Sequence, residues 1–311
     1  MKIALTGATG LIGSRFYDLL KSRYEIIPVS SSYGVDITDK NNLNKFLKSK
    51  NPGLIVHLAA KTNVDGCEVD KVEDISKLKK AKVYDGVNLD VEALKVEEWK
   101  GSVSAFGVNV VGTKNLADYS LSQDIKIIYI STDFVFDGKK DEGYSEEDVP
   151  NPIDWYGQTK FWGEKVITGK NLITRIAYPY GYKSSLKKDL IWTLVSLISE
   201  QESVKLVSDQ IITPTFIDDI VNGLDYLIEK DVVGLVNLVG NNFLSPYEIG
   251  VAIAREFNLR ESKLSLTTRE ELYKNRAERP FKMIIKNDKL RTLGFEMTDF
   301  FDSLSKIKQP L

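Results

Sequence analysis

Two residue types that build many active sites are almost missing from this 311-residue chain, which has one cysteine, Cys67, and one histidine, His57. A single cysteine excludes an internal disulfide framework and a zinc site built from cysteines, and it fits a reducing compartment. A single histidine excludes any mechanism or metal site that needs two imidazoles. Since His57 stands in an apolar run, we expect it to be packed and hydrogen-bonded. No cluster of side chains has metal-ligand spacing, so we expect no metal site.

The chain also lacks an excess of one charge sign and a long apolar run. Forty-two basic and forty-four acidic side chains give a formal net charge of −2, which offers no basic field for nucleic acid and no polybasic membrane patch. No apolar run reaches transmembrane length, and the start, MKIALTG, is unlike a signal peptide. We expect a cytoplasmic protein that begins at Met1 and binds neither nucleic acid nor membrane.

What the chain does have is a core-forming composition and a regular order of elements. Hydrophobic residues make up 42% and charged residues 28%, as in globular proteins with a sizeable core. Short apolar runs alternate with helical patterns, and these runs lie at 2–6, 26–29, 54–58, 125–130 and 172–174. Such alternation predicts βαβ units, and therefore an α/β fold with a doubly wound parallel sheet covered on both faces. Further helices are predicted at 190–200 and 218–229.

Residues 69–104 interrupt this rhythm. They carry many Lys, Glu and Asp, with an apolar residue every three or four positions. We predict a helical insertion of one or two short helices, with Val69, Val72, Ile75 and Leu78 on a packed face. We expect it to lie above the carboxyl edge of the sheet or beside a partner subunit.

A glycine-rich loop, GATGLIG at 7–13, joins the first apolar run to the first helix. Gly7 permits a tight turn, Gly10 lets the backbone approach a pyrophosphate, and Gly13 allows close packing of helix on strand. The free N–H groups of the helix start would then receive the phosphates. The alternative is an ordinary strand-to-helix turn. The residues predicted to bind a dinucleotide here are Gly7, Thr9, Gly10, Leu11, Ile12 and Gly13.

The end of the second apolar run distinguishes NAD from NADP. An acidic side chain there would accept from the ribose 2′-hydroxyl and repel a 2′-phosphate, but Ser30 and Ser31 stand at this place. Hydroxyls can hydrogen-bond a phosphate, and Arg15 could add charge. We therefore expect NADP(H), and NAD(H) stays open as a second cofactor because no arginine follows the run. Asp36, next to Ile37, is expected to contact the adenine or to cap the next helix.

Tyr156 and Lys160 stand four residues apart, which places them on one face of a helix. Thr132 follows the run at 125–130, at the carboxyl edge of the sheet, where such folds place their ligands. A neighbouring ammonium lowers the pKa of a phenol from about 10, so we expect Tyr156 to give a proton to a carbonyl oxygen as hydride arrives at carbon. Thr132 would donate a hydrogen bond to the same oxygen, and Lys160 would also hold the nicotinamide ribose. The alternative is a surface YxxxK on an amphipathic helix.

These motifs resemble those of the extended short-chain dehydrogenase/reductases, and within them the dTDP-4-dehydrorhamnose reductase family of sugar-nucleotide reductases. The likeness covers nearly the whole chain. The blocks that carry it include GATGLIG (7–13), HLAAKTNVDGCE (57–68), VNVVGTKNLA (108–117), ISTDFVFDG (130–138), YGQTK (156–160) and DQIITPTFIDDI (209–220). The resemblance implies a dinucleotide-binding Rossmann domain at 1–180, interrupted by the insertion at about 69–104. A smaller substrate-binding lobe would follow at 181–311 and partly return to the main sheet.

The resemblance also implies site residues. The family's catalytic threonine, tyrosine and lysine match Thr132, Tyr156 and Lys160. The stretch that passes the nicotinamide ribose matches Ala59, Ala60 and Lys61. Positions that line the sugar site match Thr62, Val64, Asp133, Phe134, Tyr178 and Thr213, of which Tyr178 also borders the nicotinamide. The family commonly has tryptophan at Tyr178 and tyrosine at Phe134, and both changes keep an aromatic wall.

The activity implied by the resemblance is NADP(H)-dependent reduction of the 4-keto group of a nucleotide-linked deoxysugar, namely dTDP-4-dehydrorhamnose to dTDP-rhamnose. The same residues could serve another keto sugar, or a sugar-nucleotide epimerase that retains its cofactor through each turnover. A further alternative is a non-catalytic regulatory subunit, because the β subunit of methionine adenosyltransferase is similar to this family. We hypothesise that the insertion at 69–104 borders the substrate pocket. A homodimer is one of the oligomeric states that stay open.

Overall fold

The computed structural model describes residues 1–183 and 189–308. The chain forms two compact units. The first comprises Met1–Val135 and Asn151–Thr174, and the second comprises Phe136–Pro150 and Arg175–Leu311. Compared with the expected domains, the second unit also takes up residues 136–150 and 175–180, because these segments pair and pack with later parts of the chain. Tyr144, for example, bridges to Ile285.

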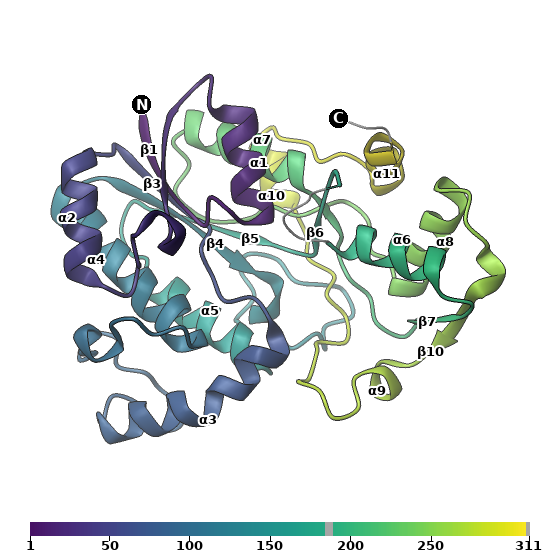
Figure 1. Cartoon of the computed structure of the whole chain (residues 1–311), viewed down its shortest axis with the longest axis horizontal. Coiled ribbons are helices and arrows are strands. Elements are labelled where there is room, and N and C mark those ends of the chain that lie inside the picture. Colours follow the sequence, from purple (N-terminus) through teal and green to yellow (C-terminus); the bar gives the residue numbers. More distant parts are fainter. Residues whose placement is uncertain (184–188, 309–311) are drawn as a thin grey trace. The chain divides into compact units, whose positions relative to one another are not determined.

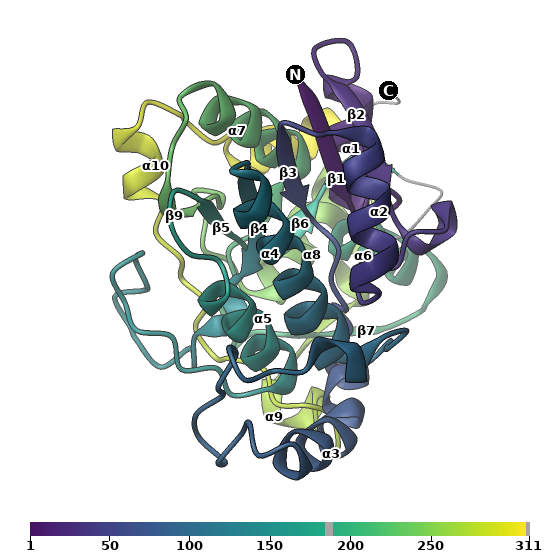
Figure 2. The same cartoon turned by 90° about the vertical axis from the view of Figure 1, so that its left-hand side faces the viewer.

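A six-stranded parallel sheet has the strand order β2-β1-β3-β4-β5-β9. Figure 1 shows its inner strands β1, β3, β4 and β5, and Figure 2 also labels the outer strands β2 and β9. Its first-unit strands are β1 (Lys2–Thr6), β2 (Glu25–Val29), β3 (Leu54–His57) and β4 (Lys126–Thr132). β5 (Leu172–Ile176) runs from the first unit into the second, where Leu238, just after β9 (Gly234–Asn237), bonds to Arg175. The predicted doubly wound α/β fold is confirmed. Its strands lie where the apolar runs placed them because a sheet covered on both faces buries nearly every strand residue.

The strand order reverses at β1, because the chain passes from β1 outward to β2 and then back to β3. Crossovers between parallel strands are right-handed, so this reversal puts α1 (Leu11–Leu20) on one face of the sheet. The helices on the other face are α2 (Lys40–Lys50), α4 (Thr113–Gln123) and α5 (Trp155–Lys165). Figure 2 shows α2 and α4 side by side, and their buried residues Leu43 and Leu116 share one core cluster with Ile55 of β3. The carboxyl ends of β1 and β3 therefore meet at the point where doubly wound sheets bind ligands.

The segment between β3 and α4 begins with a long helix, α3 (Val64–Lys80). It continues through a hairpin closed by a bridge between Tyr84 and Leu89 and through the short 3-10 turn η2 (Val96–Trp99). The π-helical stretch η3 (Gly107–Gly112) then leads directly into α4.

The predicted packed face of α3 is wrong in its first half. Val69 and Val72 are 78% and 79% exposed. The buried residues of α3 are Cys67, Asp74 and Leu78, which recur at helical spacing on a different face. Asp74 stands where the apolar pattern has a gap, so hydrophobic periodicity cannot find this face.

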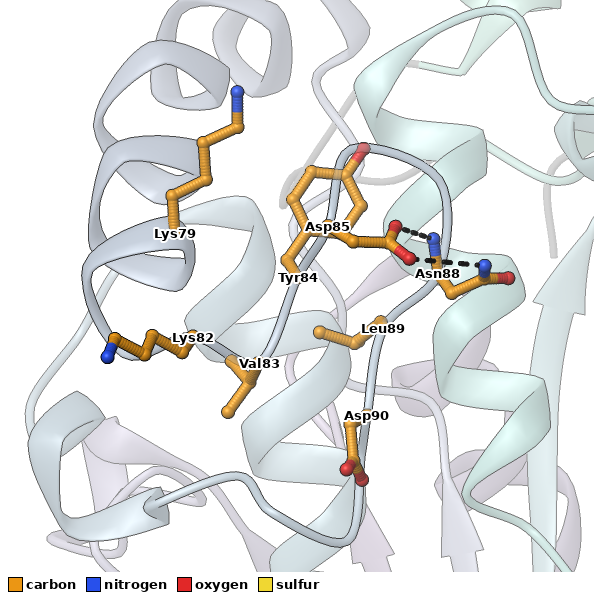
Figure 3. A pocket seen from close by; sticks show the side chains of 8 residues that line it. All are labelled: Lys79, Lys82, Val83, Tyr84, Asp85, Asn88, Leu89 and Asp90. Carbon is orange, nitrogen blue, oxygen red and sulfur yellow. Dashed lines mark hydrogen bonds between the residues drawn. The ribbon is translucent and has the colours of Figure 1, made fainter.

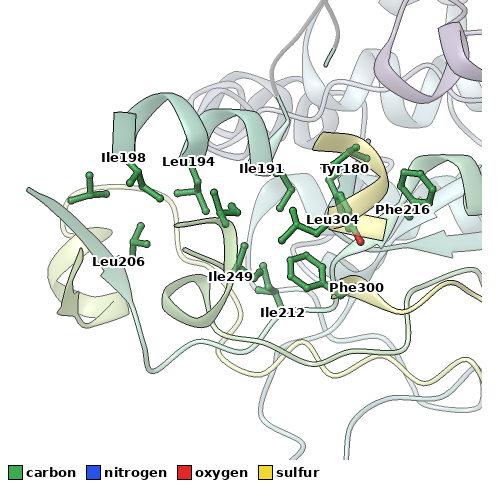
Figure 4. Close-up of a cluster of buried hydrophobic side chains, with 13 residues drawn as sticks. Tyr180, Ile191, Leu194, Ile198, Leu206, Ile212, Phe216, Ile249, Phe300 and Leu304 are labelled. Carbon is green, nitrogen blue, oxygen red and sulfur yellow. The ribbon is translucent and has the colours of Figure 1, made fainter. Parts of the chain in front are cut away.

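The second unit is built on a separate apolar core. Figure 4 shows Tyr180, Ile191, Phe216, Ile249 and Phe300 meeting in this cluster. Two small parallel strand pairs, β6–β8 and β7–β10, border it. The strands and main helices are β6 (Pro179–Tyr180), α6 (Leu190–Glu200), β7 (Val204–Val207), β8 (Thr215–Phe216), α7 (Ile217–Glu229), α8 (Pro246–Glu256) and β10 (Leu264–Thr267). Three shorter helices follow, namely α9 (Arg269–Leu272), α10 (Asp288–Thr292) and α11 (Phe300–Lys308).

The helices predicted at 190–200 and 218–229 are confirmed by α6 and α7. Over residues 1–183 and 189–308, the structure has no helix with both the length and the apolar character that crossing a membrane requires.

Candidate active site

The glycine-rich loop links β1 to α1 at the carboxyl edge of the sheet. Gly7 has a φ of +68°, and a Cβ on it would lie 2.8 Å from the Ala59 nitrogen. A Cβ on Gly13 would lie 2.1 Å from the Gly7 carbonyl oxygen. Both positions therefore require glycine, one for its backbone conformation and both for the close approach of neighbouring backbone.

The start of α1 is open to a ligand. Its N-cap is Gly10, and no side chain makes a capping hydrogen bond. By contrast, Asp39 caps α2 and Asp154 caps α5 through their side chains. Thr9 and Gly10 are exposed, so the first-turn N–H groups of α1 can receive an anion. This loop fits the pyrophosphate of a dinucleotide.

Ser30 and Ser31 lie at the end of β2, where a dinucleotide's adenosine ribose is expected. Ser30 caps the short turn η1 (Ser31–Tyr33), and its Oγ lies 2.6 Å from the Oγ of Ser32. Ser31 and Ser32 are exposed. The end of β2 thus presents hydroxyl groups and no carboxylate.

Asp36 does not cap the following helix, so that part of the prediction is wrong. Its Oδ1 accepts hydrogen bonds from the backbone N–H and the hydroxyl of Thr38, both at 2.8 Å. The Asp36 side chain thus accepts from the residue two positions further along, as in an Asx turn, and it is Asp39 that caps α2. Contact of Asp36 and Ile37 with an adenine stays a prediction.

His57 joins β1, β3 and α4 rather than facing a ligand. Its Nδ1 lies 2.7 Å from the hydroxyl of Thr6, and its Nε2 lies 3.0 Å from the hydroxyl of Thr113. Burial lowers the pKa of His57 to about 3, so the ring is neutral. The expectation of a packed, hydrogen-bonded histidine is confirmed.

The stretch after β3 is held by hydrogen bonds from both sides. The Ala59 N–H donates to the hydroxyl of Thr6 at 3.0 Å. Lys61 donates its N–H to Oδ1 of Asn109 at 2.8 Å, and its ammonium pairs with Asp70 at 2.6 Å. Ala60 and Lys61 are partly accessible, whereas Thr62 is exposed and Val64 opens α3. This stretch lies beside the glycine loop, since Ala59 approaches Gly7.

Thr132, Tyr156 and Lys160 come together at the carboxyl end of β4. The Thr132 hydroxyl lies near enough to the Tyr156 phenol to influence the pKa of that phenol. The Lys160 ammonium donates to the Ile130 carbonyl at 2.7 Å and lies 4.0 Å from the centre of the Tyr129 ring. The three side chains are 5%, 9% and 2% exposed, in that order. The structure thus pairs the threonine with the tyrosine and directs the lysine toward β4.

The expected lowering of the Tyr156 pKa is wrong for this structure. Burial raises the pKa of Tyr156 above its ordinary value, and the neighbouring Thr132 hydroxyl opposes only part of this effect. Burial also lowers the pKa of Lys160 to about 7, and its ammonium donates to Ile130 rather than to Tyr156. Tyr156 therefore keeps its proton at neutral pH, which is the state that a proton donor needs.

Asp133 adds a buried acceptor beside this pair. Its Oδ1 accepts from the Thr132 hydroxyl at 2.9 Å, whereas Oδ2 has no hydrogen-bond partner among the described residues. Burial raises the pKa of Asp133 to about 7. The Phe134 ring meets the Tyr156 ring edge-on, with centroids 5.6 Å apart. A ligand hydroxyl placed here would find both an unsatisfied carboxyl oxygen and an aromatic wall.

Tyr178 and Thr213 belong to the second unit. Tyr178 has a φ of +39°, and its carbonyl accepts from the Thr215 N–H at 3.2 Å. The Thr213 hydroxyl donates to the Met283 carbonyl at 2.7 Å. Their contribution to a sugar site stays a prediction.

Two buried polar residues near the site were missed. Asn109, in η3, bonds both to the backbone of Lys61 and to the hydroxyl of Thr159 on α5. Asp74, in α3, bonds to Trp155 of α5. The VNVVGTKNLA motif could have indicated Asn109. Nothing in the sequence distinguishes Asp74, because it is one of many charged residues in the segment at 69–104.

A hollow of about 650 Å³ lies on the hairpin that follows α3 (Figure 3). It is lined by Lys79, Lys82, Val83, Tyr84, Asp85, Asn88, Leu89 and Asp90. None of these is a predicted site residue. The Asp85 carboxylate shown in Figure 3 accepts hydrogen bonds from the backbone N–H and the side-chain amide of Asn88 in the same turn.

Comparisons with known proteins agree on one family. The family model described as the RmlD substrate binding domain matches residues 1–82 and 93–311. The dTDP-4-dehydrorhamnose reductase of Aggregatibacter actinomycetemcomitans is 29% identical over 266 residues, which cover 82% of this chain and 79% of the relative. Methionine adenosyltransferase 2 subunit beta of Bos taurus is 28% identical over 309 residues, which cover 94% of this chain and 82% of the relative.

Solved structures give the same picture. The dTDP-4-dehydrorhamnose reductase of Bacillus anthracis, in complex with NADP, superposes with a TM-score of 0.82 at 27% identity. The match covers 99% of this chain and 98% of that one. Of the predicted insertion at 69–104, the part that the family model leaves unmatched is 83–92, which contains the hairpin.

Proposed function

The chain belongs to the RmlD substrate binding domain family, and on this premise we propose that it is an NADP(H)-dependent oxidoreductase of nucleotide sugars. The predicted membership of the dTDP-4-dehydrorhamnose reductase family is thereby confirmed. The proposed reaction is reduction of the 4-keto group of dTDP-4-dehydrorhamnose to dTDP-rhamnose. The observation that carries it is the buried group of Thr132, protonated Tyr156 and Lys160 at the carboxyl end of β4.

The proposed proton transfer follows from these side chains. Tyr156 donates its proton to the carbonyl oxygen of the sugar, while the Thr132 hydroxyl donates a hydrogen bond to the same oxygen. The chemistry that bound NADPH supplies is a hydride for the carbonyl carbon. Loss of the proton leaves a phenolate, which the buried ammonium of Lys160 stabilises one helical turn away. Because the site is buried, these charges act on one another with little screening by water.

The dinucleotide would lie across the carboxyl ends of β1, β2 and β3. The open N-terminus of α1 and the hydroxyls that end β2 support this placement. The residues proposed to hold it are Gly7, Thr9, Gly10, Leu11, Ile12, Gly13, Ser30, Ser31, Asp36, Ile37, Ala59, Ala60, Lys61, Tyr156, Lys160 and Tyr178.

The sugar would lie beside Tyr156. The free oxygen of Asp133 would accept from a sugar hydroxyl, and Phe134 would form the wall. Thr62, Val64, Tyr178 and Thr213 are the further residues proposed for this site. We also propose a cytoplasmic location, which Cys67 supports because a lone, buried thiol fits a reducing compartment.

The test is oxidation of NADPH by the purified chain with a panel of nucleotide-linked 4-keto sugars. Turnover of dTDP-4-dehydrorhamnose, with the alcohol as product, is the expected result. An epimerase would instead be purified with a tightly held nucleotide at unit stoichiometry and would consume no NADPH. Turnover of none of the sugars would contradict the proposed reaction.

A second candidate is a non-catalytic regulatory subunit, favoured by the similarity to methionine adenosyltransferase 2 subunit beta. The close pairing of Thr132 and Tyr156, with Lys160 behind them, supports chemistry instead. Stable co-purification with a methionine adenosyltransferase catalytic subunit, without any reductase turnover, would favour the regulatory role.

The cofactor preference should change when a carboxylate ends β2. The wild-type chain should bind NADPH at least as tightly as NADH, because hydroxyls rather than a carboxylate face the 2′-phosphate. Ser30→Asp should weaken NADPH binding by about tenfold or more, or about 1.4 kcal/mol, since the added charge repels the phosphate. Fluorescence titration with both dinucleotides measures the effect.

Ser30→Asn is the matched control, because it adds similar bulk without charge. It should change the ratio of the two Kd values far less than Ser30→Asp. A wild-type chain that binds NADH much more tightly than NADPH would contradict our interpretation of the serines.

A further inference from the structure

A buried carboxylate ties α3 to the start of α5. Asp74 of α3 is 2% exposed, and its Oδ2 accepts from the indole N–H of Trp155 at 3.0 Å. The same oxygen accepts from the Phe106 N–H at 3.1 Å, and the Ser104 hydroxyl lies near enough to influence the pKa of Asp74. Burial raises the pKa of Asp74, as it does for any carboxylate removed from water. Removing one donor would leave part of a buried acceptor unsatisfied, so these contacts hold their partners firmly in place.

Trp155 is held a second time by α3. Its backbone N–H donates to Oε2 of Glu68 at 2.9 Å, and Glu68 is itself paired with Lys71 at 2.6 Å. Trp155 is the first residue of α5 and directly precedes Tyr156. Both its main chain and its side chain are therefore anchored to the same neighbouring helix.

Aromatic rings extend this contact along α5. Trp162 meets Trp155 edge-on, with centroids 5.3 Å apart, and Tyr84 meets Trp162 in the same way at 5.5 Å. Tyr84 belongs to the hairpin at 83–92 that the family model leaves unmatched. Figure 3 shows this hairpin, in which Tyr84 bridges to Leu89.

The other side of α5 packs too closely on its neighbours to shift freely. A Cβ on Gly157 would lie 2.1 Å from the Phe134 carbonyl, and one on Gly163 would lie 2.2 Å from the Tyr129 hydroxyl. The helix is therefore held between β4 with its following turn on one side and α3 with the hairpin on the other. Weakening the second side would let the first turn of α5, which carries Trp155 and Tyr156, move away from Thr132, while Lys160 stays bonded to the Ile130 carbonyl.

We propose that Asp74 is a positioning residue, which acts through Trp155 to hold the phenol of Tyr156 against Thr132, and that the hairpin at 83–92 supports the same helix face through Tyr84. This inference rests on the proposed function of Tyr156 as proton donor. It assigns a role in catalysis to Asp74 and to the hairpin at 83–92, although neither contacts the hydroxyl of Thr132 or that of Tyr156.

The first test is Asp74→Leu, which keeps a side chain of similar size but has no oxygen to accept from the Trp155 and Phe106 donors. We expect kcat for the keto sugar to fall about 10- to 100-fold, because small displacements of a reacting group are costly. The Kd for NADPH should stay within about twofold, since the glycine loop and Ser30 do not contact Asp74. Trp155→Phe, which keeps an aromatic ring but removes the indole N–H together with the five-membered ring, should act in the same direction. Val87→Ala, on an exposed residue of the same hairpin, should leave kcat unchanged.

A double-mutant cycle with Tyr156→Phe separates positioning from general destabilisation. If Asp74 acts through the phenol, Asp74→Leu should not lower the residual rate of the Tyr156→Phe chain any further. An equal fold-loss in both backgrounds would overturn the inference, as would a kcat for Asp74→Leu within twofold of wild type. If Asp74→Leu fails to fold, as judged by circular dichroism, the same cycle with Trp155→Phe decides. Wild-type activity in the Tyr156→Phe chain would overturn the proposed function itself, whereas loss of that activity together with a wild-type kcat in Asp74→Leu would overturn only the positioning role.

Discussion

Tyr156→Phe should lower kcat for dTDP-4-dehydrorhamnose about 10²- to 10⁴-fold, the usual worth of a general acid. The substitution removes the phenolic proton and leaves the ring against Phe134, so the shape of the site is kept. The Kd for NADPH should change little, because the proposed phosphate-binding loop at β1 is untouched. Steady-state NADPH oxidation and a fluorescence titration of the cofactor measure the two quantities.

Tyr17→Phe is the control for this experiment, since Tyr17 is an exposed tyrosine on α1. It should keep wild-type kcat. A Tyr156→Phe chain with near-normal reductase activity would remove Tyr156 from the mechanism.

Lys160→Met should weaken both turnover and cofactor binding, each by about tenfold or more, because the ammonium would stabilise the phenolate and hold the nicotinamide ribose. The variant should also change how stability depends on pH. Burial lowers the pKa of Lys160 to about 7 in the folded chain, so the unfolded chain binds more protons above that pH. Folding stability from this group therefore rises as the pH increases from 7 toward the unfolded pKa of about 10.4.

Urea unfolding of the apo chain at pH 7 and at about pH 8.5 measures this slope. Asp133, whose pKa is about 7, still loses protons at the start of this range, and unfolded Cys67 begins to titrate near its end, at the ordinary thiol pKa of about 8.5. Wild type and Lys160→Met share both of these groups, so the difference between their two slopes reports Lys160. The wild-type chain should become more stable across it, and Lys160→Met should lack that gain. Lys165→Met, which changes an exposed lysine of the same helix, should retain it. An identical slope in wild type and Lys160→Met would show that Lys160 is not the titrating group.

Local patterns were enough to predict the sheet, the glycine loop and the pairing of Thr132 with the helix that carries Tyr156 and Lys160. An apolar run of strand length indicates a strand that is buried on both faces. Such a strand can be recognised from its own residues, without knowing which distant segments contact it. The three glycines indicated a turn in which the neighbouring backbone leaves no room for a Cβ, and the structure shows this at Gly13. The spacing of Tyr156 and Lys160 reported a shared helix face because helical geometry is local.

Only the tertiary structure decided where buried polar groups point and what surrounds them. The Lys160 ammonium donates to β4, and burial raises the pKa of Tyr156, because both depend on strands more than 20 residues away in the chain. Val69 and Val72 are exposed while Asp74 is buried, since the donors that satisfy this carboxylate come from Phe106 and Trp155. A hydrophobic pattern records which side chains avoid water. It does not record which polar side chain finds its hydrogen-bond partners inside, and that depends on segments brought together by folding.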